Sequence, residues 1–176
     1  MYFSQFPLMA YDSTGTNKDI TVCVNLLKRV AVRTQAKSNA YYFDKYDIRE
    51  GETPESIAFD LYGDSELHWI ILFINDITDR YYGWPMTLRQ FESFLEDKYT
   101  NINAVHHYEI YQSSGDTTKV INIGTLNTDY PSATAITNYE HEMKIQDELR
   151  PIKIMKVDFI DQFVSEFSGL IEGSSF

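Results

Sequence analysis

The sequence predicts an α+β fold, and three observations indicate it. Residues 41–48 are rich in aromatic strand formers, and two helical patterns follow them directly. Residues 105–123 change to a pattern of two strands around a Ser-Ser-Gly-Asp turn, which is a hairpin signal. Residues 152–157 alternate apolar and polar side chains as a half-exposed strand does, ahead of a last amphipathic helix. A strand-helix-helix-strand centre with appended helices and strands is typical of α+β proteins.

Composition and charge disfavour several classes of partner. The 176 residues suit one compact domain, or one small module with extensions. The formal net charge of -11 repels phosphate backbones and anionic lipids, so neither nucleic acid nor a membrane surface is an expected partner. Cys23 is the only cysteine, which excludes an internal disulfide and a cysteine-based metal cluster within one chain. The longest strongly apolar run, residues 69–74, is far too short to span a membrane.

The first 40 residues are predicted to form an arm with one or two short elements. Residues 12–17 are a polar turn cluster, and residues 20–24 are rich in β-branched strand formers. The pattern over residues 24–32 fits either a strand or a short helix, and both alternatives stay open.

From residue 41 the elements are better defined. The strand 41–48 is expected to end at Gly51, after which Thr53 caps a helix that has Pro54 at its first position. Ser65 is expected to cap a second helix that runs to about residue 75. This second helix is apolar nearly all round, which is typical of a core element. The predicted inner face of the first helix consists of Ile57, Ala58 and Leu61.

Three helices are predicted in the second half of the chain. A capping box of Thr87 and Gln90 begins the first. The second is expected over residues 131–149, and it ends there because Pro151 disfavours helix at the preceding residue. Asp158 is expected to cap the third. Their predicted inner faces are Leu88, Phe91, Leu95 and Tyr99 in the first, Ile136, Tyr139 and Met143 in the second, and Ile160, Phe163, Val164, Phe167 and Leu170 in the third.

The centre of the chain resembles a LysM module. The resemblance rests on YDIREGETPESIA at residues 46–58, LYGD at residues 61–64, Trp69 and Asn75. It implies a LysM-like strand-helix-helix-strand core. The domains expected on this basis are an N-terminal arm over 1–40, a LysM-like domain over 41–86, and a C-terminal α/β extension over 87–176 that consists of a helix, a hairpin and a helix-strand-helix end.

A longer set of motifs resembles the LysM-like baseplate wedge proteins of contractile-tailed bacteriophages (myoviruses). It adds YYGWP at residues 81–85, and Leu149-Arg150 with Ile152-Lys153-Ile154 ahead of a terminal helix. The resemblance implies a structural protein of the virion, made in the host cytoplasm, that joins neighbouring wedge subunits in the tail baseplate. The implied partners are the wedge scaffold subunits and the sheath-initiating, lysozyme-like wedge protein, and no cofactor or enzymatic activity is implied.

The alternative function is that of a LysM module in a cell-wall or tail-tip protein, binding the N-acetylglucosamine of peptidoglycan. The resemblance would place its sugar groove on two loops. We favour the interpretation in which Thr53 and Pro54 only begin a helix and Gly51 only makes a turn, because a fold does not carry its binding site with it. The groove residues implied by the resemblance are Gly51, Glu52, Thr53, Pro54, Asn75 and Asp76.

Aromatic residues are the candidates for a partner interface, since Tyr and Trp are enriched at interface hot spots. Tyr81, Tyr82 and Trp84 either form a contact patch or complete the LysM-like sheet as core residues. Phe163 and Phe167 lie on the apolar face of the terminal helix, which either packs on its own chain or joins a partner.

No catalytic, cofactor or metal site is expected. His106 and His107 are neighbours in a predicted strand and should point to opposite faces, so that they cannot share a metal ion. His68 and His141 have no second histidine four residues later. The sequence contains no Gly-x-Ser-x-Gly elbow, phosphate loop or dinucleotide motif. A small wall hydrolase is a third, less favoured interpretation, since glycosidic chemistry needs only two carboxylates.

Overall fold

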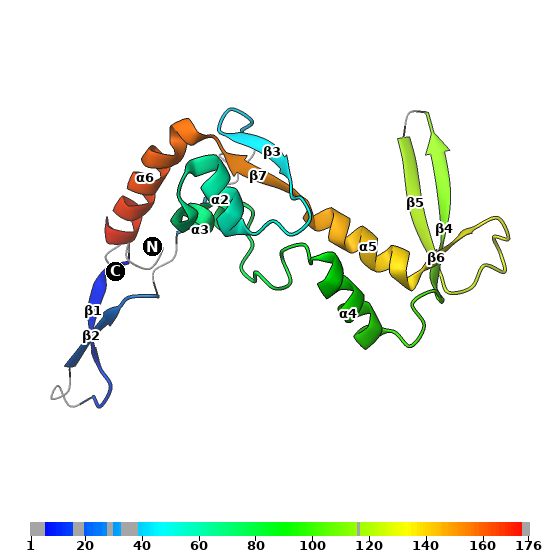
Figure 1. Cartoon of the computed structure of the whole chain (residues 1–176), viewed down its shortest axis with the longest axis horizontal. Helices are drawn as coiled ribbons and strands as arrows, with labels where there is room; N and C mark the ends of the chain where they lie inside the picture. The colour runs from blue at the N-terminus through cyan, green and yellow to red at the C-terminus, as the bar shows by residue number, and fades with distance from the viewer. Residues whose placement is uncertain (1–5, 16–19, 28–29, 33–38, 116, 174–176) are drawn as a thin grey trace. The chain divides into compact units, whose positions relative to one another are not determined.

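The computed structural model describes residues 6–15, 20–27, 30–32, 39–115 and 117–173. Helices and short strands are mixed along these residues, which confirms the α+β class (Figure 1). The chain divides into two compact units. Unit 1 comprises residues 1–47, 52–83 and 152–176, and unit 2 comprises residues 48–51 and 84–151. The domain boundaries predicted from the sequence, after residues 40 and 86, stay a prediction beside this division.

Unit 1 is built from two small sheets and three helices in its described part. One sheet is the pair β1-β2 and the other is the pair β3-β7. The elements are β1 (Leu8–Asp12), β2 (Ile20–Val24), β3 (Phe43–Asp47), α2 (Pro54–Tyr62), the 3₁₀ turn η2 (Ser65–Leu67), α3 (His68–Ile74), β7 (Pro151–Met155), the 3₁₀ turn η3 (Val157–Phe159) and α6 (Ile160–Gly173).

The strands β1 and β2 form an antiparallel hairpin in which Leu8 pairs with Val24 and Asp12 with Ile20. The strand predicted over residues 20–24 is thereby confirmed. The Asp12 side chain begins the turn, because its Oδ1 accepts hydrogen bonds from the backbone N–H groups of Thr14 and Gly15, at 2.9 and 3.0 Å. Residues 25–27 then leave the sheet in a turn, and part of the segment 24–32 lies outside the described residues.

Helix α2 begins and ends as the sequence predicts. Thr53 Oγ1 accepts from the N–H of Ser56, and Ser56 Oγ accepts from the N–H of Thr53, which makes a reciprocal capping box. The helix ends at Gly63, which has φ 76°, and the Gly63 N–H donates to Phe59 C=O. Only glycine adopts this left-handed conformation without cost, so Gly63 fixes where the chain turns toward the next helix.

The second helix starts later than predicted. Asp64, not Ser65, provides the cap, and its Oδ1 accepts from the N–H of Glu66 at 2.8 Å. The first turn after it is the 3₁₀ turn η2, and the α-helix α3 begins only at His68. Aspartate and serine are equally good caps, and Asp64 precedes Ser65. Asp64 therefore caps the 3₁₀ turn that leads into α3.

The partner strand of β3 comes from the far end of the chain. Lys156 N–H donates to Tyr42 C=O, and Ile48 N–H donates to Arg150 C=O, both at 3.0 Å, so β3 and β7 run antiparallel. Residues 81–85 contain no strand. Tyr81, Tyr82 and Trp84 therefore add no strand to this sheet, although Trp84 is buried as a core residue. The strand predicted over residues 152–157 is confirmed as β7.

An aromatic cluster forms the core of unit 1. The Trp69 ring lies 4.7 Å from the Phe167 ring and 6.1 Å from the Phe163 ring, measured between centroids. Helix α6 thus packs Phe163 and Phe167 of its predicted apolar face on α3 of its own chain. The predicted Leu170 is exposed, and Ile171 is buried in its place. Like every other described helix, α6 lacks the length and apolar content needed to cross a bilayer. The buried members of the core are Phe43, Trp69, Ile70, Ile74, Met155, Ile160, Phe167 and Ile171.

Unit 2 contains two helices and a three-stranded sheet of order β5-β4-β6 (Figure 1). The capping box of Thr87 and Gln90 begins α4 as predicted, and Phe91 and Leu95 are buried. The long hairpin predicted over residues 105–123 is confirmed. The elements are α4 (Leu88–Lys98), β4 (Val105–Ser114), β5 (Thr117–Gly124), β6 (Thr134–Thr137) and α5 (Asn138–Leu149).

Helix α5 differs from the prediction in its start and in its buried face. It begins at Asn138 rather than at Pro131, because Thr137 and Glu140 form a capping box and residues 134–137 are the strand β6. Its buried side chains are polar, whereas the predicted Tyr139 is exposed. The buried stripe consists of Asn138, Glu142 and Gln146, at a spacing of four residues.

Candidate interaction surfaces and a histidine cluster

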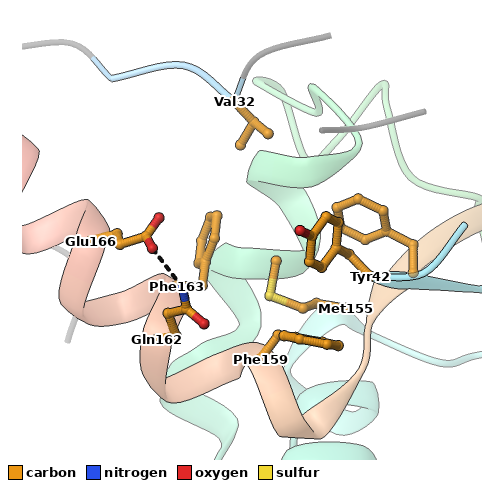
Figure 2. Close-up of a pocket in the computed structure, with 8 residues that line it drawn as sticks. Val32, Tyr42, Met155, Phe159, Gln162, Phe163 and Glu166 are labelled. Atoms are coloured by element: carbon orange, nitrogen blue, oxygen red, sulfur yellow. Dashed lines mark hydrogen bonds between the residues drawn. The ribbon is translucent and has the colours of Figure 1, made fainter. Parts of the chain in front are cut away.

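A pocket of about 220 Å³ lies in unit 1 beside the aromatic core. Figure 2 shows the side chains of Tyr42, Phe159 and Phe163 around Met155, with Gln162 and Glu166 joined by a hydrogen bond of 2.8 Å on α6. Apolar walls with a few polar groups at the edge suit an apolar side chain of another protein. The lining residues are Val32, Tyr42, Phe43, Met155, Phe159, Gln162, Phe163 and Glu166.

The candidate interface residues fall into two groups. Tyr81 and Tyr82 are 85% and 80% exposed, and Phe163 lines the pocket. Trp84 and Phe167 are only 7% and 3% exposed, so their own chain encloses them. The sequence could not separate the groups, because it does not show which neighbours cover each ring.

The loop that carries Tyr81 and Tyr82 has a defined conformation. Asp79 Oδ1 accepts from the N–H of Tyr81 at 2.8 Å, and Gly83 N–H donates to Asp79 C=O at 2.8 Å. A Cβ atom on Gly83 would lie 2.8 Å from Asp79 C=O and 2.9 Å from Ile77 Cγ2, so only glycine fits there. The backbone of the loop is therefore already ordered with both tyrosines exposed. Binding a partner there costs little further backbone entropy, which favours a contact surface.

The β1-β2 hairpin also exposes apolar side chains. A two-stranded hairpin is marginally stable unless a further surface covers one of its faces. The signal in the sequence that points to these residues is the β-branched run at residues 20–24. The exposed large side chains of the hairpin are Leu8, Tyr11, Ile20, Val22 and Val24.

The residues of the candidate sugar groove have structural roles in this chain. Thr53 caps α2, and Pro54 is buried at its first position. The Tyr46 hydroxyl donates to the Glu52 carboxylate at 2.8 Å. Gly51 and Asp76 both adopt positive φ, at 78° and 57°, as turn residues do.

Asn75 fastens the end of α3 to β7. Its Nδ2 donates to Ile71 C=O and to Lys153 C=O, and its Oδ1 accepts from the N–H of Lys153, at 2.8, 2.8 and 2.9 Å. The Asn75 amide therefore bonds to both backbone groups of Lys153, as a neighbouring strand would. Its donor and acceptor atoms thus have partners within the chain.

Replacing Asn75 with alanine is expected to destabilise unit 1 by about 1 kcal/mol, because its two hydrogen bonds to the backbone of Lys153 are lost at an exposed position where water partly replaces them. Urea unfolding of the purified chain measures the effect. Thr78→Ala is the matched control, since Thr78 is exposed nearby. Equal stability of the two variants would contradict the fastening role.

Unit 2 holds a buried carboxylate, Glu142, between two donors. Lys98 Nζ lies 2.8 Å and the Tyr99 hydroxyl 2.6 Å from Glu142 Oε1. Burial by itself would raise the pKa of Glu142, but the hydrogen bonds from Lys98 and Tyr99 outweigh it, and the pKa lies below its ordinary value. Glu142 is therefore ionised at neutral pH and ties α5 to the end of α4.

The stability that Glu142 provides is expected to depend on pH. Because its pKa is lower in the folded than in the unfolded chain, this stability is complete above the ordinary carboxyl pKa of about 4.3 and is lost as the pH falls through the folded-state pKa. Glu142→Gln should lower the melting temperature at neutral pH and flatten its fall in acid. Thermal melts across this range test it, with the exposed Glu148→Gln as control; identical acid profiles of the two variants would oppose it.

Three histidines of unit 2 meet between β4 and α5. The His106 and His107 Nδ1 atoms lie 2.8 Å apart, and the rings of His106 and His141 stack with centroids 3.9 Å apart. One ring nitrogen from each histidine lies within 4.8 Å of the other two. His68 belongs to unit 1, where its Nδ1 lies 2.9 Å from Ser65 C=O.

The expectation that His106 and His107 point to opposite faces is wrong. Val105 pairs with Thr137 and His107 with Ile136, so two steps along β4 oppose one step along β6. This register shift is a β-bulge at His106, which interrupts the alternation of side chains and brings both rings to one side. Nothing in the local sequence pattern signals the bulge, so the pattern could not predict the cluster.

A carboxylate orients the buried His107. Its Nε2 lies 3.1 Å from Glu109 Oε1, and Lys144 Nζ lies 3.3 Å from the same oxygen. Burial would raise the pKa of Glu109, but the hydrogen bonds from His107 and Lys144 lower it below its ordinary value. Burial, together with the neighbouring His141 and His107, lowers the pKa of His106. His106 is therefore neutral at neutral pH.

Comparison with known proteins gives two matches. The model of the family described as Base plate wedge protein 53 matches residues 1–122. The curated protein Baseplate wedge protein gp53 of Enterobacteria phage T4 is 26% identical over 191 residues, an alignment that covers 99% of this chain and 97% of that protein. The similarity thus extends through both units.

Proposed function

Because the chain belongs to the family of Base plate wedge protein 53, we propose that it is a structural component of a phage tail baseplate that joins neighbouring wedge subunits by protein–protein contacts. The observation that carries the proposal is the match to a baseplate wedge protein along nearly the whole chain. The family supports a place in the virion tail, and the joining role is our inference from the surfaces described above.

We further propose that β3, α2, α3 and β7 form a LysM-like unit, into which unit 2 is inserted between α3 and β7. The order strand, helix, helix, strand supports this, as does the antiparallel pairing of β3 with β7. In this proposal the LysM-like unit is a scaffold that holds contact surfaces, and the chain is not an enzyme.

The surfaces that we assign to wedge contacts expose apolar side chains, and the chain that carries them has a negative net charge. The tyrosine pair Tyr81 and Tyr82, the β1-β2 hairpin and the pocket beside Phe163 expose apolar groups that a partner can cover. The formal net charge of -11 favours basic patches on the partners. The resemblance to wedge proteins suggests the wedge scaffold subunits and the sheath-initiating, lysozyme-like wedge protein as these partners.

Peptidoglycan binding is the less favoured function. Asn75 and Thr53 would have to contact the sugar, but their polar groups already hold β7 and begin α2. A sugar would have to replace bonds that the fold uses.

The test is co-expression of the full chain with the other wedge proteins of the same phage, followed by affinity purification and sizing of the complex. The double variant Tyr81→Ser, Tyr82→Ser is expected to fold normally, because both rings are exposed, and to assemble less. Tyr130→Ser is the matched control, since Tyr130 is an exposed tyrosine of unit 2.

Sedimentation with purified peptidoglycan runs beside this experiment. Assembly with the wedge proteins and no retention on peptidoglycan supports the proposal. Retention on peptidoglycan without any wedge complex would replace it with the wall-binding function. If the double tyrosine variant assembles normally, the wedge role still stands, but Tyr81 and Tyr82 are not part of the interface.

A further inference from the structure

Three histidine side chains converge in unit 2, outside the surfaces assigned above to wedge contacts. His106 and His107 come from β4 and His141 from α5, so the cluster bridges two elements. His107 is buried, whereas His106 and His141 are half-buried, which leaves an approach from solvent. Imidazole nitrogens at this spacing are the ligands that zinc and related divalent ions prefer.

The orientation of His107 is that of a metal ligand. A carboxylate oxygen accepts hydrogen bonds, so in the 3.1 Å contact between them His107 Nε2 donates to Glu109 Oε1. When the His107 ring is neutral, its other nitrogen, Nδ1, then carries no proton. The lone pair of this Nδ1 atom faces His106 Nδ1. Histidine ligands commonly donate their second ring N–H to a carboxylate in this way, which fixes the tautomer and raises ligand basicity.

We propose that His106, His107 and His141 bind one divalent transition-metal ion of the zinc class, with Glu109 as the positioning residue for His107. The Nδ1 atoms of His106 and His107 are the ligand atoms from β4, and one ring nitrogen of His141 is the third. Three histidines leave a fourth tetrahedral position, which water or a further ligand fills.

To bind one ion, the ring nitrogens of the three histidines must change their distances from one another. Two nitrogens that bind one zinc ion tetrahedrally lie about 3.3 Å apart, given Zn–N bonds of about 2.0–2.1 Å. The 2.8 Å separation of the His106 and His107 Nδ1 atoms and the 4.8 Å limit of the whole cluster bracket this value. The rings of His106 and His141 stack almost parallel, at 12°, whereas a metal ion lies in the plane of each imidazole that binds it. One of these two half-buried rings must therefore rotate about its side chain to place its nitrogen on the ion.

The surrounding charges balance one another, so no net positive charge opposes a bound cation. Glu109 contacts His107 directly, and Glu142 interacts electrostatically with His106 and His141. The two carboxylates offset the ammonium groups of Lys144 and Lys98, which bind them. The ion would join β4 to α5 and stabilise the bulged end of the sheet, so its role is structural and independent of the wedge contacts.

The test is a titration of the full chain, freed of any tag and stripped with a chelator, with Zn²⁺ by calorimetry and with Co²⁺ by visible absorption. One ion per chain, a tetrahedral Co²⁺ spectrum and a raised melting temperature are expected. His141→Gln, on the half-buried ligand, should lose the one-to-one binding. Glu109→Gln should keep the stoichiometry and weaken the affinity about 10- to 100-fold.

His68→Ala is the matched control and should bind as the original chain does, because His68 lies outside the cluster. Absence of one-to-one binding in the original chain would overturn the proposal, as would unchanged binding by His141→Gln. A readout that needs no variant is ¹⁵N NMR of the imidazoles: Zn²⁺ should shift the Nδ1 signals of His106 and His107, and unchanged signals would also overturn the site. None of these outcomes depends on baseplate assembly.

Discussion

A chain that ends at Arg150 is expected to lose the fold of unit 1. The deletion removes β7 and α6, and with them six buried apolar side chains. Each contributes about 1.5–3 kcal/mol by its burial, so the loss is comparable to the whole stability of a domain, about 5–15 kcal/mol. It also leaves the hydrogen-bonding edge of β3 unpaired. The six side chains are Ile152, Ile154, Met155, Ile160, Phe167 and Ile171.

Near-UV circular dichroism measures this loss, because the signal of the packed Trp69 ring should vanish. Leu170→Ser is the control, since Leu170 lies on the exposed face of the removed helix α6 and should change the signal little. A truncated chain with the original spectrum and an original melting transition would show that β7 and α6 are dispensable attachments.

Replacing Trp69 with alanine is expected to cost about 3–5 kcal/mol, the usual range for removing a buried aromatic ring. Trp69 is 5% exposed and lies between α3 and α6, where it contacts the rings of Phe73, Phe163 and Phe167. These three rings cannot close the space that the indole leaves, because they are fixed on two different helices.

Urea unfolding followed by far-UV circular dichroism measures the cost as a lower midpoint at an unchanged slope. Tyr81→Ala is the matched control, an aromatic truncation at an exposed position, and should stay within about 0.5 kcal/mol of the original chain. If the two variants have the same midpoint, Trp69 does not hold α6 in place.

Local signals were enough to predict much of the fold. The helices α2 and α4 follow their predicted caps, Thr53 with Pro54 after it and the capping box of Thr87 and Gln90, and the hairpin β4-β5 follows its turn signal. Each of these elements depends on residues within a few positions of one another. The resemblance to baseplate wedge proteins is likewise confirmed by the family match.

Features that depend on distant contacts could not be predicted. The pairing of β3 with β7 joins segments about a hundred residues apart, and no pattern in either strand names the other. The polar stripe of α5 is buried because Glu142 and Gln146 meet donors from Lys98, Tyr99 and Met86. A periodicity argument assigns such residues to solvent, and only the partners reveal that they are inside.

The sequence identified aromatic residues as interface candidates, but it did not show which of them are exposed. Tyr81, Tyr82 and Phe163 are accessible, so their role in partner contact stays a prediction that the assembly experiment tests. Trp84 and Phe167 are enclosed by the chain itself. The histidine cluster lay beyond prediction, since a single bulged residue reverses the expected direction of a side chain.

The late arrival of β7 has a consequence for synthesis on the ribosome. At about 5–20 residues per second, β3 leaves the ribosome several seconds to tens of seconds before its partner strand exists. Unit 1 therefore cannot close until nearly the whole chain has been translated, and unit 2 can fold in the meantime. A product that terminates before β7 would therefore lack a closed unit 1, whatever the state of unit 2.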